Sequence, residues 1–312
     1  MHLVSVVIPA RDAAATLCRA VRSVLAQDYK AIEVVVVDDA SRDGTAAVAE
    51  ALGARLIRLD WPQGAAAARN AGIAAARGEL IAFQDADDEW LPGKLRRQVA
   101  LLLAEPSAVF VACGARLVGQ DGTDRGPLYD GRIPDAGAEA WRGLLAHNTI
   151  ATPCVVAWRH ALAAVGPFDA TLPVAEDQDM WLRLAMHGRL AYLDAFLVRV
   201  HVTPVSVSGV GTALGSRQQR AITLPLVRRH LAAKCAELSR REVRHILATR
   251  LGRVGRASYS DRDYLAGLAL VARAMWFGDR PAGNLLFLLS ASPPGRWLKR
   301  IGRLGGRRVA AG

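Results

Sequence analysis

The chain has 312 residues, 52% of them hydrophobic and 22% charged, which supplies enough apolar side chains for a buried core and excludes a disordered chain. Its net charge of +11 is unevenly placed: residues 1–214 carry 20 basic and 24 acidic side chains, and residues 215–312 carry 20 and 5. Because the basic excess belongs to the C-terminal third alone, the composition argues against a nucleic-acid-binding protein, and we predict no nucleic-acid partner.

The N-terminus and the cysteines indicate a cytoplasmic protein. The first residues lack the basic segment and the small-residue cleavage site of a signal peptide. No apolar run reaches the roughly 20 residues that a membrane-spanning helix needs. The four cysteines lie far apart and form no Cys-x-x-Cys pair, which argues against a zinc knuckle and a disulfide framework. We therefore predict a reducing, cytoplasmic environment.

Short apolar runs and helical patterns alternate through the first hundred residues. Strands are predicted from runs rich in β-branched residues at 4–8, 32–37, 55–59 and 79–83. Helices are predicted from apolar residues at helical spacing at 13–26, 45–52, 64–76 and 92–103. The strands are apolar on both faces, so the alternation predicts an α/β, Rossmann-like fold with a mostly parallel central sheet flanked by helices.

The alternation loosens beyond residue 106. Further strands are predicted at 109–118, 154–158 and 190–198, and further helices at 138–146 and 179–187. After Ser208 the pattern becomes helical and rich in arginine to the end of the chain. We therefore predict an α/β domain over residues 1–214 and a helical, basic C-terminal region over residues 215–312.

Polar and charged side chains gather where the predicted strands end, and ligands of a parallel sheet bind outside these carboxyl ends. The segments at the first four strand ends are Pro9-Ala10-Arg11-Asp12, Asp38-Asp39, Gln63-Gly64 with Arg69 farther along the helix, and Asp85-Ala86-Asp87-Asp88. No Gly-x-Gly-x-x-Gly follows the first strand, and the chain has no P-loop motif. This argues against a dinucleotide site and an NTPase.

Asp85, Asp87 and Asp88 place three carboxylates within four residues. They repel one another unless a cation or strong hydrogen-bond donors compensate their charge. Mg²⁺ typically takes one or two protein carboxylates, and phosphate and water supply its other ligands. The position after a strand favours a divalent cation that bridges a diphosphate. The alternative is a solvated acidic turn that caps the helix beginning at Pro92.

Three other positions have two interpretations each. Asp39 directly follows a strand, so its carboxylate can accept a hydrogen bond from a ribose hydroxyl or a nucleobase N–H, whereas Asp43 or Ser41 farther along the loop can cap the next helix. Glu176 and Asp177 precede a predicted helix, where capping competes with a role for Asp177 as a general base. His201 follows a strand and is either a packed histidine or a neutral ligand that completes a metal shell.

Taken in order, five motifs resemble those of glycosyltransferase family 2, the inverting nucleotide-sugar transferases of GT-A fold. The motifs are Val-Ser-Val-Val-Ile-Pro at 4–9, Val-Asp-Asp-Ala-Ser-Arg-Asp-Gly-Thr at 37–45, the segment 64–72 with Ala-Arg-Asn-Ala-Gly, Asp-Ala-Asp-Asp with Trp-Leu-Pro at 85–92, and Glu-Asp-Gln-Asp at 176–179. The resemblance covers residues 3 to about 208, two thirds of the chain.

The resemblance implies a role for each matched residue. Asp39 resembles the aspartate that contacts the nucleobase, Arg69 the basic residue near the nucleotide, and Asp177 the catalytic base. Asp87 belongs to the Asp-x-Asp motif as a metal ligand, and His201 lies in a segment that resembles an Arg-x-His element and is predicted as a second metal ligand. The residues predicted to bind the substrate are Pro9, Ala10, Arg11, Asp39, Gly64, Arg69, Asp85, Ala86 and Glu176.

Three positions depart from the family pattern. Arg11 stands where many members have an aromatic residue, so we do not predict which nucleobase is bound, although a guanidinium also stacks. Gln63 replaces a common asparagine, and Ala40 a common glycine. None of the three departures removes a charge that the chemistry needs.

The residues and the resemblance together predict an inverting glycosyltransferase that uses Mg²⁺ or Mn²⁺ and moves a sugar from a nucleoside diphosphate to a hydroxyl acceptor. We expect a glycan or lipid-linked acceptor in the synthesis of cell-envelope polysaccharide, glycolipid or glycan. A nucleotidyltransferase is an alternative, but it typically has a glycine- and lysine-rich loop after the first strand. A catalytically inactive sugar-nucleotide-binding scaffold is another, but it typically loses one of Asp87 and Asp177.

The basic C-terminal region also has two interpretations. Residues 296–304 mix basic and apolar side chains at helical spacing, and the apolar stretches 265–277 and 285–289 are too short to span a bilayer. This pattern suits a helix that lies on anionic lipid at the cytoplasmic face of a membrane, which would place the enzyme near a lipid-linked acceptor. The alternative is a solvated helical cap with a basic end.

Overall fold

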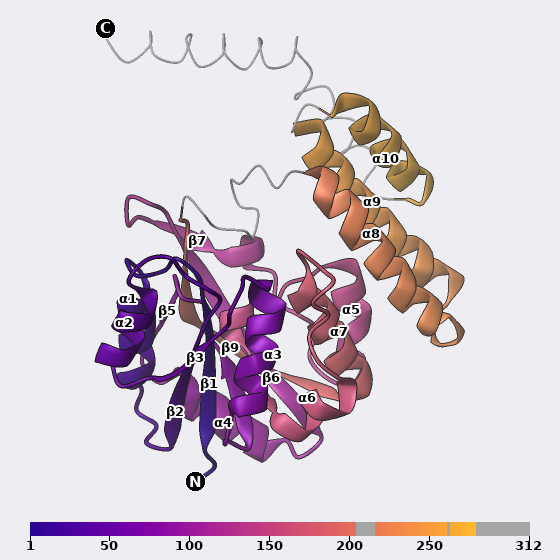
Figure 1. Cartoon of the computed structure of the whole chain (residues 1–312). Helices are drawn as coiled ribbons and strands as arrows, with labels where there is room; N and C mark the ends of the chain where they lie inside the picture. The colour runs from indigo at the N-terminus through magenta and orange to yellow at the C-terminus, as the bar shows by residue number, and fades with distance from the viewer. Residues whose placement is uncertain (204–215, 261–262, 279–312) are drawn as a thin grey trace, which may run out of the picture. The chain divides into compact units, whose positions relative to one another are not determined.

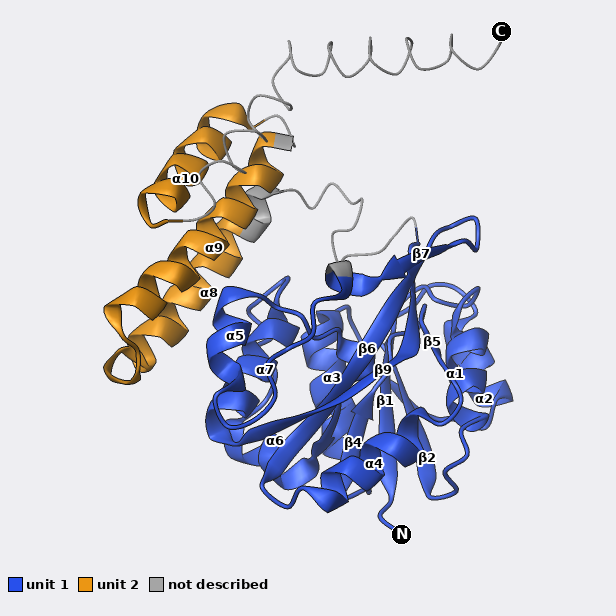
Figure 2. Cartoon of the chain, turned by 180° about the vertical axis from the view of Figure 1, so that it is seen from behind, with its two compact units in different colours: residues 1–210 blue, residues 211–312 orange. Residues whose placement is uncertain are grey.

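The structure, a computed structural model, describes residues 1–203, 216–260 and 263–278 (Figure 1). The chain divides into two compact units, Met1–Val210 and Gly211–Gly312, and each is described by itself (Figure 2). The predicted domain boundary after residue 214 and the basic segment 296–304 lie outside the described residues, so both stay predictions.

The first half of unit 1 alternates strands and helices, as its periodic pattern predicts. Its elements are β1 (Val4–Ala10), α1 (Leu17–Leu25), β2 (Ile32–Asp38), α2 (Thr45–Ala51), β3 (Arg55–Arg58), α3 (Gly64–Ala75), β4 (Leu80–Phe83), β5 (Glu89–Trp90) and α4 (Lys94–Ala104). β1 pairs in parallel with β2 and with β4, and β2 pairs in parallel with β3. The carboxyl ends of these strands therefore lie at one edge of the sheet.

The second half of unit 1 extends the same sheet with mixed pairing. Its elements are β6 (Ala108–Val118), β7 (Asp124–Pro127), η1 (Leu128–Gly131), α5 (Ala140–Ala146), η2 (Thr152–Cys154), β8 (Val156–Trp158), α6 (Arg159–Val165), α7 (Glu176–His187) and β9 (Arg189–His201). β8 is antiparallel to β4 and β6, β9 is parallel to β6, and β5 is antiparallel to β9. The strand order β3-β2-β1-β4-β8-β6-β9-β5 confirms the predicted α/β class with a mostly parallel sheet.

One predicted strand is shorter than expected. The pattern predicts a strand over residues 154–158, but β8 begins at Val156 because a 3₁₀ turn over Thr152–Cys154 precedes it. Pro153 lies in that turn, and a proline has no N–H to donate to a sheet ladder. The chain can therefore pair only from the residues after the turn.

Helices cover both faces of the sheet, with α3 and α4 on opposite sides in Figures 1 and 2. Val6 and Ile8 belong to a core that includes α1 and α4, whereas Val35 and Val37 pack with Ala68 of α3 on the other face. This follows from the period of two along a strand, which sends successive side chains to opposite faces. Burial on both faces fixes α3 against the sheet and so places its first turns at the carboxyl edge.

Unit 2 is helical, as the sequence predicts. Its elements are α8 (Ser216–Ala233), η3 (Cys235–Glu237), α9 (Arg240–Ser260) and α10 (Tyr264–Trp276). Leu224, Leu251, Val254 and Ala274 form a small core shared by the three helices. Among the residues that the structure describes, no helix is both long enough and apolar enough to cross a bilayer.

Candidate functional site

The loops that follow β1 and β2 are joined by hydrogen bonds at the carboxyl edge of the sheet. The Asp12 N–H donates to the Ser41 hydroxyl over 2.9 Å, and the Arg42 N–H donates to the Asp12 carboxylate over 2.8 Å. The Ala13 N–H donates to the Thr45 hydroxyl over 2.8 Å. Asp12 has a backbone φ of 47°, a left-handed conformation that aspartate tolerates better than most residues. The two loops therefore form one connected surface.

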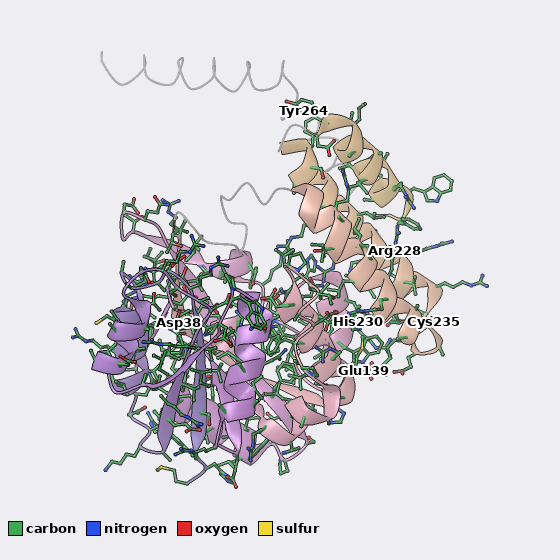
Figure 3. All side chains as sticks on the ribbon, in the orientation of Figure 1. Asp38, Glu139, Arg228, His230, Cys235 and Tyr264 are labelled. Carbon is green, nitrogen blue, oxygen red and sulfur yellow. The ribbon has the colours of Figure 1, made fainter. Side chains whose placement is uncertain are left out.

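Asp38 and Asp39 have different partners although they are adjacent in the chain. Asp38, labelled in Figure 3 at the end of β2, accepts the N–H of Ser41 over 3.0 Å, so its carboxylate closes its own loop. Asp39 is 3% exposed and accepts the N–H groups of Gln63 and Gly64 over 2.6 and 2.9 Å, one on each carboxylate oxygen. Asp39 thus holds the first turn of α3 against β2, and each of its oxygens keeps a further lone pair.

The residues predicted at the end of β1 lie beside Asp39. The Asp39 N–H donates to the Ala10 carbonyl over 2.8 Å, which brings the ends of β1 and β2 together. Pro9 lies in β1, one residue before Ala10, and Arg11 is exposed just beyond the strand. Ala86, by contrast, is buried in the core.

Arg69 lies between two carboxylates that come from distant segments of the chain. Its side chain is 6% exposed, and its Nη1 and Nη2 contact Glu176 Oε1 and Asp85 Oδ1 at 2.7 and 2.9 Å. Its guanidinium carbon also lies 5.7 Å from the centre of the Phe168 ring. Burial alone would lower the pKa of Arg69, but the two carboxylates raise it above its ordinary value. Arg69 therefore joins α3, the loop after β4 and the first turn of α7 through charge.

Asp177 follows Glu176 in the first turn of α7 and is half-buried. Burial and the neighbouring Glu176 carboxylate raise the pKa of Asp177 to about 7, against the lowering effect of the Arg69 guanidinium. One carboxylate oxygen accepts the N–H of Gln178 over 2.6 Å. Ala175, just before the helix, has a φ of 65°, a conformation that costs an alanine free energy. The sequence pattern places both acidic residues ahead of the helix, whereas the structure places them in its first turn.

Two further contacts hold the chain around α7 in place. The Asn70 side chain of α3 exchanges two hydrogen bonds with the backbone of Phe168, at 2.8 and 2.9 Å. Arg183 contacts Asp179 at 2.8 Å and donates to the carbonyl of Val165 over 2.7 Å. Asp179 is therefore a structural partner of Arg183 within α7, at the i,i+4 spacing that favours such a pair. The first contact connects the loop before α7 to α3, and the second connects α7 to the end of α6.

The Asp-x-Asp segment places three carboxylates close together, and Arg69 pairs with the first of them, Asp85. Burial and the Asp85 carboxylate raise the pKa of Asp87, and burial with the carboxylates of Asp85 and Asp87 raises the pKa of Asp88 well above its ordinary value. Arg19 of α1 donates to the Asp87 carbonyl, and the Thr203 hydroxyl donates to the Asp87 carboxylate over 3.3 Å. A carboxylate cluster of this kind is stabilised by any further positive charge placed against it.

Pairing between β5 and β9 brings His201 to this segment. Glu89 and Trp90 pair with Arg199 and Val198, and the His201 N–H donates to Asp88 Oδ1 over 3.0 Å. The His201 Nε2 lies 3.5 Å from a Glu89 oxygen and is buried without a hydrogen-bond partner. Burial, together with the charge of Arg19, lowers the pKa of His201. The lowered pKa favours the neutral imidazole, the form that can act as a metal ligand, although the Glu89 carboxylate acts in the opposite direction.

A divalent cation would fit this segment if the oxygens of a bound diphosphate supplied its remaining ligands. No group of three or more His, Cys, Asp or Glu side chains surrounds a single metal position within the described ranges 1–203, 216–260 and 263–278. The backbone of His201 is held to Asp88, the neighbour of Asp87 in the chain, and the carboxylates around Asp87 favour added positive charge. This donor set suits Mg²⁺ or Mn²⁺ with diphosphate oxygens as further ligands.

Arg19 is a residue of this site that the sequence pattern does not single out. It lies on α1, whose apolar spacing predicts only a packed helix, yet it reaches the backbone of the Asp-x-Asp segment and its Nε is buried without a hydrogen-bond partner. An arginine between apolar positions of an amphipathic helix is the one local signal that could have drawn notice. Its partner lies 68 residues away, which local periodicity cannot predict.

Comparison with known proteins identifies one family. The sequence profile of Glycosyl transferase family 2 matches residues 5–162. The UDP-Glc:alpha-D-GlcNAc-diphosphoundecaprenol beta-1,3-glucosyltransferase WfaP of Escherichia coli is 30% identical over 216 residues, which cover 67% of this chain and 81% of WfaP. The succinoglycan biosynthesis protein ExoO of Rhizobium meliloti is 48% identical over 99 residues, 31% of this chain. The chain spans only 28% of ExoO, and 50% of the Bacillus subtilis protein TuaG, a putative teichuronic acid biosynthesis glycosyltransferase that is 38% identical over 126 residues.

Solved structures show the same fold. The mannosyltransferase PcManGT of Pyrobaculum calidifontis, solved with GDP-Man and Mn²⁺, has a TM-score of 0.60 at 21% identity, covering 95% of this chain and 83% of its own. Residues 1–349 of Staphylococcus aureus TarS, solved with UDP, give 0.53 at 20% identity, covering 87% of this chain and 88% of that one. At these identities the likeness supports the fold, which is the GT-A arrangement that the sequence predicts.

Proposed function

The chain belongs to glycosyltransferase family 2, and we propose that it transfers a sugar from a nucleoside diphosphate to an acceptor hydroxyl with inversion at the anomeric carbon. The observation that carries this proposal is the placement of Asp177. Its carboxylate, with a pKa of about 7, lies in the first turn of α7 next to Glu176, which Arg69 connects to Asp85 of the Asp-x-Asp segment. A base beside the diphosphate-binding segment is what attack on the anomeric carbon requires.

In the proposed reaction, the acceptor oxygen attacks the anomeric carbon and its proton moves to a carboxylate oxygen of Asp177. The bond between the anomeric carbon and the phosphate oxygen breaks, and its electron pair leaves with the nucleoside diphosphate. Because catalysis by a general base is most efficient when its pKa lies near the working pH, the raised pKa of Asp177 suits this role. The product retains the acceptor oxygen, and the sugar is inverted because attack and departure occur on opposite sides.

The residues at the strand ends would hold the sugar donor. The lone pairs that remain on Asp39 can accept hydrogen bonds from a nucleobase, and Arg11 is exposed at the same edge. Pro9, Ala10 and Gly64 would form the adjoining backbone surface. Asp87 and His201 would hold Mg²⁺ or Mn²⁺, which supplies charge stabilisation for the departing diphosphate when it is bound. Of the related structures, PcManGT was solved with Mn²⁺.

Arg69 would position the reacting groups through its two ion pairs. It contacts Asp85 in the Asp-x-Asp segment and Glu176 in α7 at 2.9 and 2.7 Å. These two ion pairs would hold the proposed metal-binding segment at a constant distance from the proposed base. Asp85, Glu176 and Arg69 would therefore act by orientation, which supplies a large share of the rate in bimolecular reactions. Ala86, buried between Asp85 and Asp87, would keep that turn closely packed.

The names of the relatives suggest the class of acceptor. WfaP is named for transfer to a sugar on diphosphoundecaprenol, and ExoO and TuaG for succinoglycan and teichuronic acid biosynthesis. We infer for this chain an acceptor sugar carried on a lipid diphosphate or on a growing cell-envelope polysaccharide. A cytoplasmic location, with the active site facing the inner leaflet, accords with such an acceptor and stays a prediction.

The test is a screen for release of nucleoside diphosphate from UDP-, GDP- and dTDP-sugars with a lipid-diphosphate-linked sugar as acceptor, first with Mn²⁺ or Mg²⁺ and then with EDTA. We expect one donor to be turned over, and Asp177→Asn to bind that donor with unchanged affinity while losing turnover. Asp121→Asn, a carboxylate in the exposed turn between β6 and β7, is the matched control. Normal turnover by Asp177→Asn would exclude it as the base, and absence of donor binding across the panel would overturn the proposed activity.

A further inference from the structure

Helix α10 of unit 2 is apolar on every side. Its thirteen residues, Tyr264–Trp276, include one charged side chain, Arg273. One side of the helix packs on α9, where Gly267 comes so close that an added Cβ would lie 2.7 Å from the Tyr259 nitrogen. Val271 and Ala274 are fully buried on this packed side. Within the described part of unit 2, this packing buries only one side of the helix.

The side of α10 that does not pack on α9 is an exposed apolar stripe. Leu265, Leu268 and Trp276 are 85%, 42% and 88% exposed, and Ala269 and Ala272 are exposed between them. At about 100° per residue these five positions fall within one arc of about 100°. Single exposed apolar residues are ordinary on protein surfaces, but a continuous stripe of them marks an interaction surface. We call these five residues the α10 stripe.

The rest of unit 2 is strongly basic. Residues 215–312 carry 20 basic and 5 acidic side chains. The exposed arginines on α8 and α9 are Arg228, Arg229, Arg240, Arg241, Arg244 and Arg253, of which Figure 3 labels Arg228. Two of the acidic residues are already paired: Asp263 contacts Arg220 at 3.0 Å, and Glu237 contacts Lys234 at 2.6 Å. The field of this unit therefore attracts an anionic partner.

We propose that the α10 stripe docks flat on an anionic phospholipid bilayer. An exposed apolar stripe on a strongly basic unit, with the exposed Arg273 on the same helix, is the pattern of helices that lie in the headgroup region, with leucines at the acyl boundary and a tryptophan at the interface. A helix of thirteen residues is about 20 Å long, too short to cross a hydrocarbon core of about 30 Å. The helix therefore lies on the membrane and does not span it.

Two other occupants of the stripe fit the observations less well. A second copy of the chain would bring two units of charge +15 face to face, which like-charge repulsion opposes. A nucleic acid would satisfy the positive charge, but it would leave the leucines and the tryptophan without an apolar partner. An anionic bilayer satisfies both the charge and the stripe. The proposal goes beyond sugar transfer and does not depend on it, because docking is measured on vesicles without sugar donor or acceptor.

The test is flotation of the full chain with phosphatidylcholine vesicles that contain or lack phosphatidylglycerol. We expect binding to the anionic vesicles only, and a loss of about tenfold or more in the bound fraction for the triple variant Leu265→Ser, Leu268→Ser, Trp276→Ser. The matched control is Leu25→Ser with Leu103→Ser, two exposed leucines of unit 1 that are 54% and 49% exposed. This control should bind like the unaltered chain.

A second measurement locates the contact. Brominated acyl chains quench a tryptophan that enters the bilayer, so quenching by anionic vesicles should fall in Trp276→Phe, which keeps an apolar ring and leaves six other tryptophans in place. Unchanged quenching in Trp276→Phe, or equal flotation of the triple variant and the unaltered chain, would overturn the proposal. So would a dimer mass in light scattering that the triple variant converts to a monomer in the absence of vesicle binding.

Discussion

Replacing Arg69 tests whether charge connects the Asp-x-Asp segment to α7, which carries the proposed base. The guanidinium is almost completely buried and contacts Asp85 and Glu176 at 2.9 and 2.7 Å, so Arg69→Met leaves two carboxylates close together without their shared cation. Loss of one partner from a buried ion pair costs about 3–5 kcal/mol. Because the Asp85 side chain is 28% exposed and water can screen it, we expect a cost near the lower end, about 3 kcal/mol.

The same substitution should change the pH dependence of turnover. Arg69 lowers the pKa of Asp177, which burial and Glu176 raise to about 7. A general base acts when it is deprotonated, so kcat/KM should rise with pH through about 7 in the unaltered enzyme. Without the Arg69 charge, the pKa of Asp177 rises further, and the rising limb of the profile should move to higher pH.

The assays are urea unfolding of the chain and a pH profile of nucleoside diphosphate release. Arg183→Met is the matched control. Arg183 also forms an ion pair with a carboxylate of α7, that of Asp179 at 2.8 Å, but it lies outside the proposed reaction. Arg183→Met should lower the free energy of unfolding and leave the rising limb of the pH profile unchanged. Arg69→Lys keeps the charge but cannot contact Asp85 and Glu176 with two separate nitrogens, so it should lose less stability than Arg69→Met. If Arg69→Met showed an unchanged pH profile of turnover and lost less than about 1 kcal/mol in free energy of unfolding, the reasoning would be refuted.

Three further predictions follow from other contacts. Glu176→Gln removes a charge that raises the pKa of Asp177, so the rising limb of kcat/KM should move to lower pH; an unmoved limb would contradict this. Removing divalent cations with EDTA should abolish release of nucleoside diphosphate, and Asp87→Asn should raise the Mn²⁺ concentration needed for half-maximal rate; equal Mn²⁺ titrations would exclude Asp87 as a ligand. Lys94 is buried over the Trp90 ring without a hydrogen-bond partner, and burial lowers its pKa from 10.5 to about 8. Since the unfolded chain binds the proton more tightly, stability should rise between about pH 8 and 10.5 by about 3 kcal/mol, and Lys94→Met should remove that rise in urea unfolding.

Much of the fold and half of the site follow from local sequence pattern. The strands at 4–8 and 32–37 are visible because buried parallel strands are continuous apolar runs, and helices between them show the 3.6-residue period. A parallel arrangement then places every strand end at one edge, so Asp39 and the Asp-x-Asp segment can be assigned to that edge without coordinates. The pairing of β8 with β4 and β6, and that of β5 with β9, cannot be predicted in this way, because strands of two or three residues carry too little periodic signal.

The tertiary structure decides which of these side chains meet. Arg69 and Glu176 are 107 residues apart, and His201 and Asp88 are 113 apart; such pairs depend on the paths of the intervening loops and on the register of β9 against β5. Local periodicity reports which face of an element is buried, but not what lies opposite that face. The sequence therefore determined the family, the fold and the edge of the sheet to which we assign the site. The network of Arg69, the position of Arg19 and the raised pKa of Asp177 arise only when packing brings distant charges together in a medium that screens them weakly.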